Sequence, residues 1–270
     1  MLLEAATLTF GLAGFAVTKL KTGAEVAAVS PTPGKDYHVL VFPGGSGNGQ
    51  ADELGEAGLA AVRAFVAAGG GYIGTCGGAF LGIQHLFFYG EGPNGPGGHR
   101  GPPTQEPFAR GHGDVLVEFT DTGMGELKLN PTVFGSGGDR NVTIMYWQGP
   151  IVKEEDLPGN VSRLATFRSE IHSGHTNETT GEMVNTPAIT SIGYGKGRVV
   201  LNSPHPEIPT EVGPLDPAGN HTFPSVYAGE LAWVLRRGDT GYGPHSPAHP
   251  GTRVSQLYTG STAVLKFSKL

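Results

Sequence analysis

The chain has little cysteine and little charge, and each shortage excludes a class of protein. Its one cysteine among 270 residues, Cys76, excludes an internal disulfide and a zinc site built from cysteines. Charged residues make up 16% of the chain, and the formal net charge of −6 offers no basic surface for nucleic acid or anionic membrane. No stretch approaches the roughly 20 apolar residues of a membrane helix. We therefore expect a small-molecule substrate or ligand, with no nucleic-acid or membrane partner. The oligomeric state stays open.

The first residues, "MLLEAATLTFGLAGFAVTKLK", carry no basic leader, and we expect no signal peptide and a cytoplasmic location. One pattern points to export instead. Asn141, Asn160, Asn177 and Asn220 each begin an N-x-S/T sequon, where chance would give about one or two. Because an exported protein needs a leader, the cytoplasm remains our expectation.

Glycine and proline are abundant, with 45 and 21 residues. This composition predicts many tight turns and long loops between compact elements. Residues 89–113 are the densest such stretch, and we expect either a loop that covers a functional site or an insertion. From Gly238 the sequence is polar apart from one late apolar run. We therefore expect one domain over residues 1–237 and a C-terminal tail over residues 238–270.

Strand-like and helix-like patterns alternate between residues 37 and 88. "YHVLVFPGG" (37–45) is an apolar run that stops at a turn, and residues 51–71 place apolar side chains at helical spacing before a glycine run. "YIGTC" (72–76) predicts a second strand that leads into a second helix. This order predicts an α/β fold with a parallel sheet. Further strands are expected at 15–22, 114–120, 142–147, 163–167 and 198–203, and further helices at 3–11 and 223–237.

Cys76 stands on the turn between that strand and the helix after it. Gly74, Gly77 and Gly78 provide the space that a tight strand-to-helix turn needs, in the G-x-C-x-G pattern of a nucleophile elbow. The helix N-terminus would stabilise a thiolate, and the Gly77 N–H would face an oxyanion formed beside it. The alternative is a buried cysteine without a chemical role, which is the usual state of a free cysteine.

A thiol nucleophile needs a base, and His205 is the best candidate among the ten histidines. "RVVLNSPHPE" leads from a β-branched strand into His205, Pro206 and Glu207. In an extended segment residues i and i+2 point the same way, so Glu207 would hold the imidazole in one tautomer. The alternative is a proline-stiffened surface loop. His172 and His175 have a spacing that could bind a metal, but without a further ligand nearby we expect no metal site.

The P-G-G sequence after the strand at 37–45 offers a second oxyanion donor. Gly44 and Gly45 lie just past the carboxyl end of the strand, where ligands bind in open α/β sheets. The backbone N–H of Gly45 would complete an oxyanion hole with Gly77. A simple Pro-Gly turn is the alternative.

The P-G-G loop, the G-x-C-x-G turn and the later H-P-E together resemble the class I glutamine amidotransferase-like superfamily. "YHVLVFPGGSG", "FVAAGGGYIGTCGGAFLG", "YWQGP" and "GKGRVVLNSPHPE" are most similar to the biotin–protein ligase N-terminal domain, over roughly residues 37–237. The resemblance implies Cys76 as nucleophile, His205 as base, Glu207 as its orienter, and Gly45 and Gly77 as the oxyanion hole. It also implies a flavodoxin-like three-layer α/β/α fold with a mostly parallel central sheet, and no cofactor.

The sequence departs from the superfamily in two places. Glutaminases have a glutamine four residues after the cysteine, and this chain has Phe80 there. Family members open with a β-strand before their first helix, whereas this chain begins inside that helix. We therefore expect one of two outcomes, either a sequence truncated at its start or a sheet that lacks its first strand. We also expect a substrate other than glutamine.

These observations predict a cysteine-dependent hydrolase or amidotransferase-like protein for a small amide or related carbonyl substrate. The residues expected to line its pocket are Gly44, Phe80, Tyr146 and Gly149. A non-catalytic module that binds a small molecule or a partner is the alternative, and Phe80 favours it. The intracellular-protease branch of the superfamily fits less well, because its members usually have a histidine directly after the cysteine.

Overall fold

The computed structural model describes residues 16–88, 111–127, 129, 140–171, 183–208, 252–255 and 264–269. The helices expected at 3–11 and 223–237 lie outside these residues. So do nearly all of loop 89–113, the histidines at 172 and 175, and most of the tail after residue 238.

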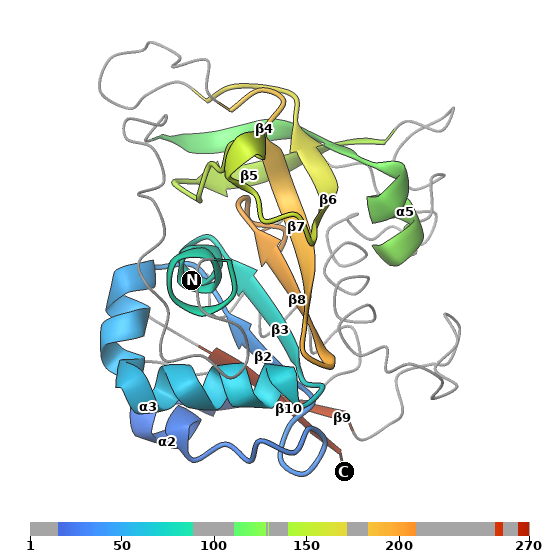
Figure 1. Cartoon of the computed structure of the whole chain (residues 1–270). Coiled ribbons are helices and arrows are strands. Elements are labelled where there is room, and N and C mark those ends of the chain that lie inside the picture. The colour runs from blue at the N-terminus through green and yellow to red at the C-terminus, as the bar shows by residue number, and fades with distance from the viewer. Residues whose placement is uncertain are drawn as a thin grey trace.

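The strands form one mixed, curled sheet (Figure 1). Along the sheet the strands are β1 (Ala16–Leu20), β9 (Thr252–Ser255), β10 (Val264–Lys269), β2 (Val39–Phe42), β3 (Gly71–Thr75), β8 (Gly197–Asn202), β7 (Pro187–Tyr194), β6 (Val161–Phe167), β4 (His112–Phe119) and β5 (Asn141–Trp147). The seven strands from β2 to β5 are continuous in this order, and β10, β9 and β1 extend the sheet beyond β2. The α/β class expected from the sequence is confirmed.

The expectation of a mostly parallel sheet is not confirmed. Among the described strands only β2–β3, β3–β8 and β1–β9 pair in parallel, and the pairs from β8 through β7, β6 and β4 to β5 are antiparallel. A parallel pair needs a long crossover, which α3 (Gly47–Ala67) provides between β2 and β3. By contrast, the two residues Gly195 and Lys196 join β7 to β8 as a hairpin, with Gly195 at a φ of 59°.

The position between β1 and β2 is filled by the far end of the chain. Strand β1 matches the strand expected at 15–22, and β10 pairs antiparallel with both β1 and β2. The sheet therefore has an inner strand here, supplied by the late apolar run of the tail. The sequence reasoning had assigned that run to no element.

Helix α3 begins at a Ser46 N-cap, whose hydroxyl accepts from the N–H of Gly49 at 3.0 Å, and bends at Gly55. Its buried face carries Leu59, Val62 and Phe65, as the helical spacing predicts. A shorter helix, α2 (Gly23–Ala27), packs beside it (Figure 1).

The helix after β3 is shorter than expected. Helix α4 (Gly77–Leu81) passes into a π-helical turn, η1 (Gly82–Leu86), instead of continuing regularly to residue 88. The remaining helices of the described chain are α5 (Asp121–Leu127) and a 3₁₀ turn, η3 (Glu154–Asp156). No helix in these parts of the chain is long and apolar enough to cross a membrane.

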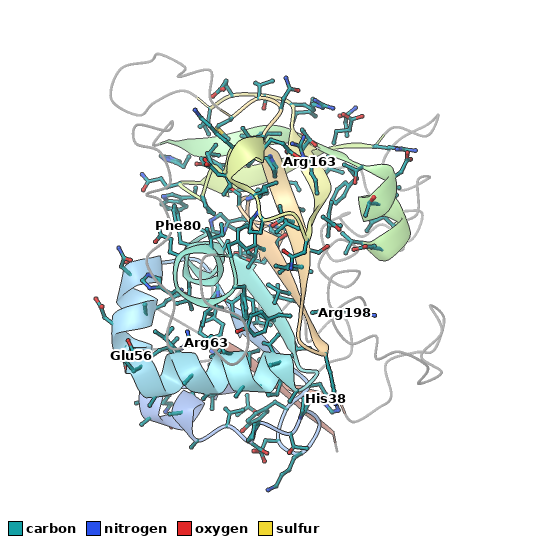
Figure 2. All side chains as sticks on the ribbon, viewed as in Figure 1. His38, Glu56, Arg63, Phe80, Arg163 and Arg198 are labelled. Atoms are coloured by element: carbon teal, nitrogen blue, oxygen red, sulfur yellow. The ribbon has the colours of Figure 1, made fainter. Side chains whose placement is uncertain are left out.

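Both faces of the central strands are buried. In β2, Val39 and Val41 belong to one apolar core with β4–β7, while Leu40 and Phe42 belong to a second core with α2, α3 and η1. Phe80 of α4 packs against the first core and lies on the side of α4 toward β5 (Figure 2). The carboxyl ends of β3 and β8 meet next to this point, and the candidate site is there.

Candidate active site

Cys76 occupies a strained turn at the carboxyl end of β3. Its φ of 52° and ψ of −106° lie outside the regions that a residue with a side chain normally adopts. The backbone is held on both sides, because its N–H donates to the Asn202 carbonyl at 2.8 Å and its carbonyl accepts from the Phe80 N–H at 2.9 Å. This geometry is that of the strand-to-helix elbow predicted from the sequence.

The glycines around Cys76 are required by close backbone packing. A Cβ on Gly74, Gly77 or Gly78 would lie 2.4, 2.2 or 1.9 Å from a carbonyl oxygen of Gly78, Gly45 or Phe42, respectively. No side chain fits at these distances, so the prediction that the turn needs small neighbours is confirmed. The Gly77 contact also places the P-G-G loop against the elbow.

The Cys76 thiol is nearly buried, with the residue 6% exposed. Its Sγ donates to the carbonyl oxygen of Trp147 at 3.2 Å. Trp147 ends β5 and begins the "WQGP" loop, so this loop lies across the thiol. The sequence reasoning assigned the loop to the wall of the pocket but did not identify this carbonyl, since backbone acceptors leave no sequence signal.

His205 and Glu207 form a fully buried pair. Nδ1 of His205 lies 2.8 Å from Oε1 of Glu207, and both side chains are 0% exposed. The intervening backbone is a turn rather than an extended segment, closed by the Ile208 N–H on the His205 carbonyl at 3.1 Å. The His205 N–H donates to the Met145 carbonyl at 2.7 Å, which ties the turn to β5. The predicted side-chain pairing is confirmed, although a turn rather than a strand produces it.

The environment of His205 favours its protonated form. Burial by itself lowers the pKa of the imidazole, but the negative charge of Glu207, hydrogen bonding with Cys76 and Glu207, and the charge of a Cys76 thiolate raise it to about 10. Nε2 has no partner that meets full hydrogen-bond geometry, and the Cys76 Sγ bonds to the Trp147 carbonyl. Cys76 is nevertheless near enough to the ring to raise its pKa. The structure therefore brings Cys76, His205 and Glu207 together.

The P-G-G loop is anchored by a residue that the sequence reasoning missed. Gln50, in the first turn of α3, is 0% exposed and donates from Nε2 to the Pro43 carbonyl at 2.9 Å. It holds the loop whose exposed end, Gly45 at φ 143°, touches Gly77. A buried polar residue on a helix was the available signal, but the sequence alone did not reveal that it was buried.

The four residues expected to line a pocket lie around this centre in different ways. Gly44 is buried in the P-G-G loop, and Phe80 is partly exposed and touches Gly47 at the start of α3. The Tyr146 hydroxyl donates to the Gly149 carbonyl at 2.8 Å. Burial, followed by the charges of Cys76 and Glu170, raises the pKa of the Tyr146 phenol above its usual range, so this ring also lies near the thiol.

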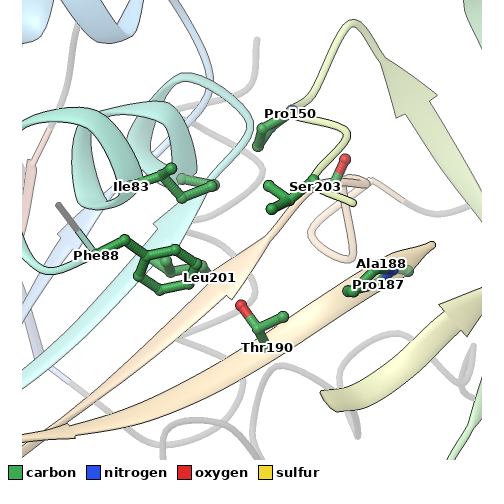
Figure 3. A pocket seen from close by; sticks show the side chains of 10 residues that line it. Ile83, Phe88, Pro150, Pro187, Ala188, Thr190, Leu201 and Ser203 are labelled. Carbon is green, nitrogen blue, oxygen red and sulfur yellow. The ribbon is translucent and has the colours of Figure 1, made fainter. Parts of the chain in front are cut away.

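A small pocket lies between α4 and η1 on one side and β7 and the end of β8 on the other (Figure 3). Its walls are apolar except for Thr190 and Ser203. Its other lining residues are Ala79, Ile83, Phe88, Pro150, Val152, Pro187, Ala188 and Leu201. Cys76 is not among them, so the pocket adjoins the candidate site without containing its reactive atom. Within the described residues no group of three or more His, Cys, Asp or Glu is placed to hold a metal ion.

Comparison with known proteins identifies one family. The family model described as "Biotin-protein ligase, N terminal" matches residues 31–224. Among curated proteins none matches.

Three solved structures are similar to this chain at low sequence identity. A cytoplasmic protein from Salmonella typhimurium is 13% identical, with 80% of each chain covered and a TM-score of 0.42. A β-galactosidase from Rahnella sp. R3 is 16% identical, with 73% of this chain and 23% of that chain covered and a TM-score of 0.29. A GH42 β-galactosidase from G. stearothermophilus is 14% identical, with 74% and 22% covered and a TM-score of 0.31. We draw no conclusion about chemistry from similarities at this level.

Proposed function

The chain belongs to the biotin–protein ligase N-terminal domain family, and we propose that its Cys76 site is the centre of a thiol-dependent hydrolase or acyl-transfer protein. The observation that carries the proposal is the buried His205–Glu207 pair beside the chain's one cysteine, which sits on a strained turn at a helix N-terminus. Strained backbone and buried charged pairs both cost stability, and they concentrate at functional sites. The substrate class is a small amide or a related carbonyl compound.

A wider relationship to the class I glutamine amidotransferase-like superfamily is part of this proposal. It is supported by the three parallel strands β2, β3 and β8, with α3 as the crossover and Cys76 at the carboxyl end of the middle strand. In open α/β sheets this edge is where ligands bind. The antiparallel part from β7 to β5 would then be an elaboration that supplies the "WQGP" wall. A cytoplasmic location belongs to the same proposal.

The proposed reaction begins from the thiolate–imidazolium pair, in which the Cys76 proton resides on Nε2 of His205. The thiolate attacks the carbonyl carbon, a C–S bond forms, and the carbonyl π electrons move onto oxygen. The N–H groups of Gly45 and Gly77 are the proposed donors to that oxyanion. When the oxyanion collapses, the C–N bond breaks and the leaving amine takes the proton from His205. A water molecule, deprotonated by His205, then attacks the thioester; collapse releases the carboxylic acid, and the proton returns to the thiolate.

The raised pKa of His205 fits this role. A ring that holds its proton strongly stabilises the thiolate–imidazolium pair, which is the reactive state of a cysteine nucleophile. The charge of Glu207 is the largest of the causes that raise the pKa of His205, and its bond to Nδ1 adds to it, so Glu207 acts as a positioning residue.

A non-catalytic module that binds a small molecule is the second candidate. Two observations favour it: Phe80 stands where glutaminases have glutamine, and the thiol is 6% exposed with its hydrogen bond directed at a carbonyl. Under this candidate Cys76 packs the turn and the site has no turnover.

A screen of small amides and thioesters distinguishes the two candidates. We expect turnover by the wild type, and loss by at least about 100-fold in Cys76→Ser and His205→Gln. His38→Gln is the matched histidine control, because His38 precedes the amino end of β2, whereas Cys76 follows the carboxyl end of the parallel strand β3, and the variant should keep full activity. Turnover that survives Cys76→Ser would refute the hydrolase proposal. A ligand that binds wild type and Cys76→Ser equally, without turnover, would establish the binding module.

A further inference from the structure

The peptide that joins Trp147 to Gln148 presents its carbonyl oxygen to the Cys76 thiol, whereas a thiolate would need an N–H. Its carbonyl oxygen accepts from Cys76 Sγ at 3.2 Å. That contact suits a protonated thiol, because an S–H can donate to it. A thiolate in the same place would face the negative end of a carbonyl dipole and would be destabilised. The observed arrangement is therefore a resting one with respect to the proposed chemistry.

This arrangement requires an unfavourable backbone conformation at Gln148. Its φ is 55°, one of three positive values among the described non-glycine residues. A positive φ is unfavourable for an L-residue that has a side chain, unless local contacts compensate. The Gln148 side chain is exposed to solvent.

The backbone on both sides of this peptide is held in place. Before it, Trp147 pairs with His112 of β4. After it, the Gly149 carbonyl accepts from the Tyr146 hydroxyl at 2.8 Å, and a Cβ on Gly149 would lie 1.9 Å from the Ser203 carbonyl oxygen, so the loop is pressed against the segment that follows β8. The Trp147–Gln148 peptide is thus the part of the loop that can turn while its ends stay in place.

We propose that the Trp147–Gln148 peptide is a two-state element that masks the Cys76 thiol as observed and, after rotation by about half a turn, donates the Gln148 N–H to the thiolate. The rotation would bring φ of Gln148 into the extended region, which any residue adopts without strain. It exchanges the carbonyl oxygen that faces Sγ for an N–H, so one motion removes a repulsion and adds a donor. The inference rests on the proposed function, because it assigns the rotated peptide to the same thiol.

Substitutions at Gln148 test the element without disturbing packing, since the side chain is exposed. Glycine adopts a positive φ freely, so Gln148→Gly should favour the masked state and slow alkylation of Cys76 by iodoacetamide at neutral pH by about fivefold. A β-branched residue opposes a positive φ, so Gln148→Val should favour the rotated state and accelerate alkylation by a similar factor. Because the chain has one cysteine, the label reports on this site alone.

Asn185→Gly is the matched control, because Asn185 has a φ of 70° at a turn before β7 and bonds to Arg163 and Arg168 rather than to the elbow or the Trp147–Gln148 peptide. It should leave the alkylation rate unchanged. A melting temperature for each variant shows that the rates refer to folded protein. Equal rates for the Gly, Val and wild-type proteins, or changes of the opposite sign, would overturn the two-state element. The proposed function is judged separately by His205→Gln, which should slow alkylation whichever way the peptide faces.

Discussion

Nδ1 of His205 lies 2.8 Å from Oε1 of Glu207, and neither side chain is accessible to solvent. Two residues that are separated by one proline thus form a buried charged pair at the end of β8. Burying such a pair costs free energy of folding, and removing one partner costs more, because it leaves the other charge buried and unpaired. Its position next to Cys76, rather than in a structural core, is the reason to assign it a chemical role.

Glu207→Gln should lower the pKa of His205 well below its value of about 10. The amide keeps a hydrogen-bonding group but removes the charge that raises this pKa most, while burial still disfavours the imidazolium. We also expect a loss of about 3 kcal/mol in the free energy of unfolding. NMR titration of the His205 ring and urea unfolding measure the two effects.

Glu118→Gln is the control for this substitution. Glu118 pairs with Arg168 at 2.5 Å, but both side chains are more than a third exposed, so its loss should cost less than about 1 kcal/mol. A pKa of His205 that stays near 10 in Glu207→Gln would mean that Glu207 does not set the charge of the ring.

The stability of the protein should depend on pH through His205. Its pKa is higher in the folded state than the ordinary 6.5, so the folded state binds this proton more tightly than the unfolded state does. The resulting stabilisation is complete below pH 6.5 and is lost as the pH rises toward 10. Urea unfolding of wild type and His205→Gln over this range should show their difference in free energy narrowing with rising pH. A difference that stays constant would contradict the assignment.

Gly78→Ala should unfold the protein or cost at least about 3 kcal/mol. The added methyl group would lie 1.9 Å from the Phe42 carbonyl oxygen, and only movement of β2 or of the elbow could relieve it. Gly125→Ala is the matched control, because nothing lies within 4 Å of a Cβ there and the residue is inside α5. It should stabilise the protein by up to about 1 kcal/mol. Thermal unfolding of both variants tests the contrast, and equal melting temperatures would refute it.

Removal of residues 252–270 should lower the melting temperature by about 5 °C or more and promote aggregation. β10 pairs with both β1 and β2, so its loss leaves two unpaired strand edges. Leu265→Pro should act in the same direction, because proline disrupts strand pairing at the residue opposite Val41. Leu265→Ala keeps the backbone N–H and is the matched control. A truncated protein that melts at the wild-type temperature would show that β10 is dispensable.

Local patterns predicted the elements that lead into the site. The apolar run that became β2, the helical spacing of α3 and the glycines around Cys76 were readable because each follows from short-range geometry. β7 was missed. Its sequence, "PAITSIGY", is buried on both faces but mixes small polar residues with apolar ones, so it shows neither alternation nor an apolar run.

Local sequence patterns could not predict whether neighbouring strands run parallel or antiparallel. A strand has the same periodicity whether its neighbour runs parallel or antiparallel, and the two-residue connection between β7 and β8 was not recognised as a hairpin. The placement of β10 between β1 and β2 joins residues more than 200 positions apart, and nothing in its composition specifies that pairing. The expected parallel sandwich was therefore only partly right.

By itself the sequence determined which residues could do chemistry: one cysteine on a glycine-lined turn, and a histidine and a glutamate separated by one proline. Tertiary structure alone decided that β3 and β8 run side by side, so that Cys76 and His205 meet at their carboxyl ends. It also decided that the Trp147 carbonyl covers the thiol and that the His205–Glu207 pair is fully buried. The physical reason is that residue types and short-range spacing are local properties, whereas burial and the orientation of a peptide group depend on packing between distant segments.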